Sequence, residues 1–352
     1  MNKNTTNSNS DKTPAWVPYP EIPVDLDDER FHQSFSIEEF NSAEAHKFFD
    51  EFGFVILRDA VEPQQNQELL DDIWTFLEET NIGFSRNDMK TWNEGLRRFG
   101  VPNGVNSIFR PALLRMRQNP KIAHAFQKIL GTDQIIVNHD RFLLHRPAGN
   151  KPEWRGPKNV HLDLNPNEFE SVKARKGLLQ RLSMLSYSDR NHRDFISENN
   201  DVHQSMGLCV QGLLNLQDLS AFDGDMTGGT IVVPGSHKEG MWPLHSDNNT
   251  AVVRGPQQYK FDKKLADQAT RVNLRAGSLL IWNQRLIHGS TPNLMNTPDK
   301  CRAAIPIRAF SKQILLQQTK RSKARARAIE RQIKLNGFES ELTALGRKVF
   351  GL

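Results

Sequence analysis

The chain has 352 residues, enough for one large domain or two small ones, and its hydrophobic fraction of 37% and charged fraction of 25% are those of an ordinary globular protein. No apolar run approaches the roughly 18 residues that a membrane-spanning helix needs, and the polar start MNKNTTNSNSDKTP has no apolar stretch of signal-peptide type. The two cysteines, Cys209 and Cys301, form no spaced metal or redox motif, so disulfides are not expected to hold the fold. These features predict a cytoplasmic protein without a membrane span.

The net charge of +5 is unevenly distributed along the chain. Residues 311–352 hold ten Lys and Arg against three Glu, so the rest of the chain is slightly acidic. We interpret 311–352 as a basic helical C-terminal tail. The basic run 319–334 contains no aromatic residue of the kind that stacks on bases. A solvated or partner-docking helix is therefore favoured over a helix that binds nucleic acid.

The elements are predicted from Gly and Pro punctuation and from hydrophobic period. Residues 1–35 are expected to be a disordered or extended N-terminal segment, polar at first and then rich in proline. The predicted helices are a short one in 42–52, one in 61–80 and one in 119–131. The predicted strands are 53–60, one long strand 135–147, a β segment in 206–220, one strand in 223–238, two in 273–293 and a last one in 301–310.

Two conclusions follow from this order of elements. Short strands separated by Gly and Pro turns, after helices in the N-terminal third, favour a β-sandwich or barrel. Residues 165–205 are charged and not periodic, and a structureless loop of that length is unusual in a compact domain, so we interpret them as an insertion or lid.

The stretch KNVHLDLNP places His161 and Asp163 on either side of one leucine. Alternate residues of a strand share a face, about 6.5–7 Å apart, so both side chains can be directed at one point. In the adjacent pair His139 and Asp140 the side chains face opposite ways, and we expect a packing or hydrogen-bonding role there. A solvated strand edge is the plainer interpretation of an isolated His-x-Asp triplet, so the rest of the chain has to decide.

An iron-binding facial triad needs a second histidine in addition to His161 and Asp163. The downstream candidates are His192, His203, His237, His245 and His288. Three of them lie in polar stretches and are most simply surface residues, while His237 follows a turn in PGSHK. His288 is the strongest candidate, because it ends the apolar segment SLLIWNQRLIHGS and precedes a glycine, where backbone can approach a ligand.

The last predicted strand, CRAAIPIRAF, carries two arginines. Arg302 and Arg308 are an even number of residues apart and share a face if the strand is regular. A cation inside an apolar strand is costly unless it binds an anion, and guanidinium suits a carboxylate. An ion pair with an internal Asp or Glu is the plainer interpretation, more so for Arg308 than for Arg302.

The motifs HLD, DMTGGTIVVPGSHK, HGSTPN and CRAAI, in this order, resemble the phytanoyl-CoA dioxygenase family of iron(II)- and 2-oxoglutarate-dependent oxygenases, and EFGFVILRDAVEPQQ resembles the opening strand and helix of that family. The resemblance covers roughly residues 45–310. It implies a mainly β fold with flanking helices, a double-stranded β-helix of the jelly-roll or cupin-like kind, for a domain that we place at 36–310.

The resemblance also implies roles for particular residues. His161, Asp163 and His288 would bind Fe(II), Arg302 would hold the distal carboxylate of 2-oxoglutarate, and Ser290 would be a second contact with it. Arg302 lies fourteen residues after His288, somewhat further than is usual in the family, so Arg308 remains a competing anchor.

The implied activity is hydroxylation of a small organic substrate with O2, releasing succinate and CO2. Hydroxylation is favoured over halogenation because Asp163 occupies the position that a halide would need. Three alternatives remain: a redox-inert metal enzyme of the same fold, which has no use for Arg302; a binding module, against which an intact triad argues; and an oxygenase directed at nucleic acid. The sequence does not identify the substrate or the oligomeric state.

Overall fold

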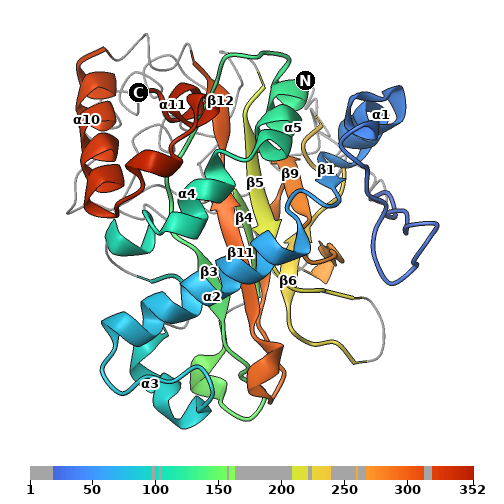
Figure 1. Cartoon of the computed structure of the whole chain (residues 1–352). Helices are drawn as coiled ribbons and strands as arrows, with labels where there is room; N and C mark the ends of the chain where they lie inside the picture. Colours follow the sequence, from blue (N-terminus) through green and yellow to red (C-terminus); the bar gives the residue numbers. More distant parts are fainter. Residues whose placement is uncertain are drawn as a thin grey trace, which may run out of the picture.

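The computed structural model describes residues 19–96, 100–102, 105–156, 158–162, 208–220, 224–238, 259–260, 267–312 and 319–352 (Figure 1). Its centre is a pair of five-stranded antiparallel sheets. The first sheet has the order β1 (Phe54–Leu57), β9 (Leu279–Asn283), β5 (Val210–Asn215), β11 (Arg302–Ile307) and β3 (Leu143–His145). The second has the order β7 (Tyr259–Lys260), β4 (Asn159–Leu162), β10 (His288–Thr291), β6 (Gly229–Val232) and β8 (Thr270–Arg271).

The inner faces of the two sheets contact each other. The indole of Trp282, on β9, lies with its ring centre 5.2 Å from that of His288, on β10. Arg302, on β11, donates from Nη2 to Thr230 Oγ1, on β6, at 3.2 Å. The order of strands and these contacts confirm the predicted double-stranded β-helix, although the two sheets do not join into a closed barrel within the described part of the chain.

Helices from the N-terminal third cover the outer face of the first sheet: α1 (Ala43–Phe52), α2 (Pro63–Thr80), α4 (Pro111–Arg117) and α5 (Pro120–Leu130) (Figure 1). Gly212 of β5 shows how closely α5 packs there, because a Cβ at this position would lie 3.0 Å from the Phe126 ring. Gly53 ends α1 with a left-handed φ of +80° and leads directly into β1. The predicted helices 42–52, 61–80 and 119–131 are confirmed to within a few residues.

One predicted strand is wrong in extent. Residues 135–147 form two short strands, β2 (Ile135–Val137) and β3, and the last strand also divides into β11 and β12 (Ala309–Ser311), which pairs with β2. The chain breaks at Asn138, whose side chain accepts from Arg308 N at 2.8 Å while its own N–H donates to the Arg308 carbonyl at 3.0 Å. Buried Arg117 donates to the Asn138 and Asp140 carbonyls, so the bend is stabilised by contacts that are remote in sequence.

The remaining described elements are short, except for the C-terminal helix α10. They are α3 (Trp92–Gly95), α10 (Thr319–Leu335), α11 (Ala344–Phe350) and the 3-10 turns Glu39–Asn41, Met89–Thr91, Val105–Ser107, Pro152–Trp154, Pro298–Lys300 and Glu339–Glu341. None of the helices in the described ranges is both long and apolar enough to cross a membrane.

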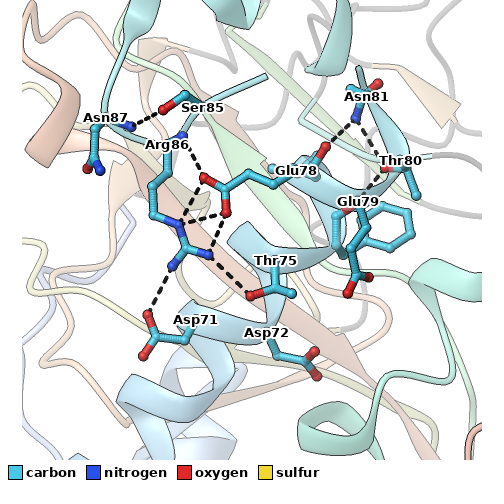
Figure 2. Close-up of polar contacts among 12 residues, drawn as sticks. Asp71, Asp72, Thr75, Glu78, Glu79, Thr80, Asn81, Ser85, Arg86 and Asn87 are labelled. Carbon is cyan, nitrogen blue, oxygen red and sulfur yellow. Dashed lines mark hydrogen bonds and ion pairs between the residues drawn. The ribbon is translucent and has the colours of Figure 1, made fainter. Parts of the chain in front are cut away.

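A polar network fastens the loop that follows α2, as Figure 2 shows. Arg86 on this loop donates to Glu78 at 2.8 Å and to Thr75 Oγ1 at 3.2 Å, and forms an ion pair with Asp71 at 3.2 Å. The hydrogen bonds from Arg86 lower the pKa of Glu78, so this contribution to stability is present while Glu78 is ionised and is lost as the pH falls into the range where carboxylates protonate. The loop ends at fully buried Trp92.

The described part of the basic tail packs on the body. Side chains of α10, α11 and the turn between them belong to the same hydrophobic core as the sheets: Ile329, Ile333, Phe338, Val349 and Phe350. Arg325 of α10 is buried and donates to the Phe350 carbonyl at 2.5 Å and to the Val137 carbonyl of β2 at 2.9 Å. The basic composition of the tail therefore describes only the exposed face of α10.

We expect Arg325→Ala to lower the free energy of unfolding by about 2 kcal/mol or more, because it leaves two buried carbonyls without these donors. Arg327, exposed on the same helix, is the matched control, and Arg327→Ala should stay within about 0.5 kcal/mol of the wild type. Denaturant unfolding measures both. Equal effects of the two substitutions would mean that the buried hydrogen bonds of Arg325 add nothing to stability.

Candidate active site

Two histidines from different strands meet between the sheets. His161 on β4 and His288 on β10 are directly paired in the antiparallel register, and their ring centres are 4.8 Å apart with a tilt of 53°. Metal–nitrogen bonds are about 2 Å long, so one ion can reach both rings at this separation. The pairing brings together residues that are far apart in the sequence.

The hydrogen bond of His288 suits metal binding. Its Nδ1 lies 2.9 Å from the Leu286 carbonyl, and because a carbonyl oxygen only accepts, Nδ1 must donate. In the neutral imidazole this leaves Nε2 unprotonated, which is the nitrogen that can bind a metal, and the Leu286 carbonyl orients the ring.

Asp163 lies outside the described residues, one position beyond the end of β4. The third ligand that we expect therefore remains a prediction. Within the described ranges no cluster of three His, Cys, Asp or Glu side chains is placed to hold a metal. The predicted insertion 165–205 and three of the alternative histidines, His192, His203 and His245, also lie outside the described residues.

Arg302 is a buried cation, 2% exposed. Its Nη2 donates to Thr230, while Nε and Nη1 are buried without a hydrogen-bond partner. Burial, with the charge of Arg271, lowers the pKa of Arg302 to about 10, so the side chain remains cationic at neutral pH. A buried guanidinium with unused donors fits an anionic ligand, because leaving such donors unpaired costs free energy.

The residues between His288 and Arg302 form a polar path. Ser290 lies two positions along β10 from His288, half-buried and on the same face, and is paired with Thr230 of β6. Thr230 in turn accepts from Arg302. A dicarboxylate that reached from the histidine pair to Arg302 would pass these two hydroxyl groups.

His145 is a residue of this region that sequence reasoning missed. It is paired with Arg302 across β3 and β11, so the two side chains share the inner face. Burial and the charge of Arg302 lower the pKa of His145 to about 3, so the ring is neutral at neutral pH. Its side chain is half-buried. No motif in the sequence marked His145, because its pairing with Arg302 joins distant strands.

Arg308 lies elsewhere. It is half-buried in the step between β11 and β12, and its backbone bonds to Asn138. Six residues of extended chain separate it from Arg302, which is roughly 20 Å. The two arginines therefore belong to opposite ends of β11 and cannot hold the same carboxylate.

The two other histidines that the sequence singled out have structural surroundings. His139 is buried in the bend after β2, with its ring 5.1 Å from that of Phe109 and 4.7 Å from that of Phe350, and burial lowers its pKa. His237 packs against Gly53 at the end of α1, where a Cβ on the glycine would lie 2.4 Å from Nδ1. The packing role expected for His139 agrees with these contacts.

Comparison with known proteins gives the family. The sequence model of the family "Phytanoyl-CoA dioxygenase (PhyH)" matches residues 192–299, which include His288. A Dictyostelium discoideum protein described as "Putative phytanoyl-CoA dioxygenase" is 30% identical over 300 residues, covering 78% of this chain and 82% of that protein. The chain belongs to the phytanoyl-CoA dioxygenase family. The resemblance seen in the motifs is thus confirmed, and with it the prediction of an oxygenase of the iron(II)- and 2-oxoglutarate-dependent class.

Solved structures agree on the fold. GlcNAc Inducible Gene 2 (GIG2) from Candida albicans superposes with a TM-score of 0.59 at 12% identity, over 90% of this chain and 78% of that one. A "Putative Oxidoreductase" from Salmonella typhimurium LT2 gives a TM-score of 0.56 at 14% identity, over 90% and 85%. At these identities the likeness concerns the fold alone.

Proposed function

We propose that this member of the phytanoyl-CoA dioxygenase family hydroxylates a small organic substrate with O2 and 2-oxoglutarate, releasing succinate and CO2. The observation that carries the proposal is Arg302, a buried cation with two unused donors that faces the sheet of the histidine pair and bonds to its strand β6. A redox-inert metal enzyme of the same fold has no use for such a group at this place.

The residues present fit iron(II) and its co-substrate. His161 and His288 supply two imidazoles, and Asp163 would supply the carboxylate if the chain stays extended beyond β4. Iron(II) bound there supplies the oxidation, in which one atom of O2 enters succinate and the other the substrate. The family uses this chemistry, and the hydrogen bond from His288 Nδ1, which directs Nε2 to a metal in the neutral ring, supports it here.

The protein's own part is to bind, orient and exclude water. Arg302 would hold the distal carboxylate of 2-oxoglutarate by charge-assisted hydrogen bonds, with Thr230 fixing the guanidinium and Ser290 as a further contact. Neutral His145 would add a hydrogen-bonding group without adding charge. Trp282, whose Nε1 donates to Gln211 at 2.9 Å, would form the apolar wall beside His288.

The test is anaerobic binding of 2-oxoglutarate with and without Fe(II), compared with glutarate, which has both carboxylates but no keto group. We expect 2-oxoglutarate to bind more tightly with the metal present, and glutarate to be insensitive to it, because only the keto acid can chelate. Succinate release over a panel of small molecules then identifies the substrate. Metal binding without any effect on 2-oxoglutarate would instead favour the redox-inert alternative.

A further inference from the structure

Gln284, the residue that follows β9, is buried, and its side chain makes no hydrogen bond within the described part of the protein. It is 5% exposed, and both Oε1 and Nε2 are without a hydrogen-bond partner. Buried polar groups are nearly always paired, so a carboxamide in this state calls for a ligand or another explanation.

The backbone places Gln284 at the end of the first sheet, where β9 passes into a turn. Its N–H donates to the Cys209 carbonyl at 3.0 Å, which extends the β5–β9 ladder by one pair beyond Val210 and Asn283. Gln284 is the second residue of the turn 283–286, which is closed by Leu286 N donating to the Asn283 carbonyl at 2.8 Å, and it lies two positions, or about 6.5–7 Å, beyond Trp282. The Trp282 ring contacts that of His288, so Gln284 lies in the short segment that joins Trp282 to His288.

Gln284 and Arg302 lie at opposite ends of the first sheet. Both positions can be compared along the chain of β5. Arg302 lies just beyond the level of Leu216, whose N–H donates to the Ala303 carbonyl, whereas Gln284 lies level with Cys209. Seven residues of extended chain, roughly 23 Å, separate those two levels on β5. His288 lies between them, level with Trp282. A co-substrate that extends from the histidines toward Arg302 leaves the Gln284 side for the molecule that is oxidised.

We propose that Gln284 is a substrate-binding residue, and that it recognises a neutral amide-type group, an N–H beside a C=O, on the substrate. The carboxamide offers one acceptor and donors side by side, and a lactam or carboxamide is the group that satisfies both ends at once. Gln284 carries no charge, so it offers no compensation to an ionised group. The Trp282 indole gives an apolar surface for the carbon skeleton next to that amide. This role for Gln284 rests on the proposed function.

The first test is stability, measured on the protein without ligand. Gln284→Met keeps the length and removes two unsatisfied polar atoms, so we expect the melting temperature to rise by about 2 °C or more. Gln118 is the matched control: it is 7% exposed, its Oε1 accepts from Thr343 N and Oγ1 at 3.0 Å, and its Nε2 donates to the Glu341 carbonyl at 2.8 Å. Gln118→Met should lower the melting temperature. A fall for Gln284→Met as large as that for Gln118→Met would overturn the proposal, because Gln284 would then be a structural residue.

The second test is binding to the protein loaded with Fe(II) and 2-oxoglutarate, without oxygen. The probes are benzamide, whose N–H and C=O lie side by side, and methyl benzoate, which has the same ring and carbonyl but no N–H. We expect benzamide to bind at least about ten-fold more tightly, and Gln284→Met to abolish the difference. Equal binding of the two probes, tighter binding of methyl benzoate than of benzamide, or a preference for benzamide that survives Gln284→Met would each overturn the proposal.

These results are separable from the proposed function. Gln284→Met should bind 2-oxoglutarate as the wild type does, because Gln284 lies on the far side of His288 from Arg302. If the wild type failed to bind 2-oxoglutarate, the proposed activity would fall, and the two probes, compared on the protein with Fe(II) alone, would still decide whether Gln284 recognises an amide.

Discussion

His288→Ala is expected to abolish iron-dependent succinate release, with a loss of at least about a thousand-fold, while the protein stays folded. The ring is one of two paired imidazoles 4.8 Å apart, and the Leu286 carbonyl orients it through Nδ1. Without this ring the site loses one of its three expected ligands and should no longer hold the metal. Measured together, iron content, succinate release and circular dichroism separate loss of metal from loss of fold.

Asp163→Ala should have the same effect, since the carboxylate is the third ligand that we expect. The controls are His124→Ala on α5 and Asp140→Ala in the bend after β2, which remove the same residue types at positions away from the histidine pair. Full activity in Asp163→Ala would mean that another carboxylate, or none, completes the site.

The second large effect concerns the two arginines. Arg302→Ala should raise the concentration of 2-oxoglutarate needed for half-saturation by about ten- to a hundred-fold, with iron binding preserved, because a buried charge-assisted contact is worth a few kcal/mol and 1.4 kcal/mol is ten-fold in affinity. Arg308→Ala should change it much less, since Arg308 lies at the other end of β11. Titration of the co-substrate with each variant measures both.

Arg302→Lys distinguishes charge from shape. It keeps the cation but loses the planar pair of donors, so we expect an intermediate requirement for 2-oxoglutarate. If Arg308→Ala were the variant with the large effect and Arg302→Ala behaved as the wild type, the anchor would be Arg308, and Arg302 would be a buried cation with some other ligand.

Much of the fold follows from local signals. Helices α1, α2 and α5 begin and end near the residues predicted from helical period and caps, and β1, β5, β6, β9 and β10 fall within predicted β segments. The single strand predicted for 135–147 was wrong because no Gly or Pro between the apolar segments 135–137 and 142–144 marks the break. Only the bonds of Asn138 with Arg308 and of Arg117 with the bend divide it, and those partners are remote in sequence.

The tail illustrates the same limit. Its basic composition predicted a solvated or docking helix, and the exposed side of α10 agrees. The apolar residues Ile329 and Ile333 nevertheless lie in the common core, and Arg325 is buried against two carbonyls. A sequence of charges gives no sign of which arginine turns inward, because that depends on which surface the helix meets.

The sequence by itself determined the family, the pair of residue types at His161 and His288, and the candidate arginines, because motif order and strand alternation are properties of the chain. Tertiary structure alone decided that the two histidines are paired across β4 and β10, and that Arg302 reaches Thr230 on the opposite sheet. It also brought His145 beside Arg302 and left the Gln284 carboxamide buried without a partner in the turn that leads to His288. Register between strands and burial depend on contacts between distant segments, which no local pattern specifies.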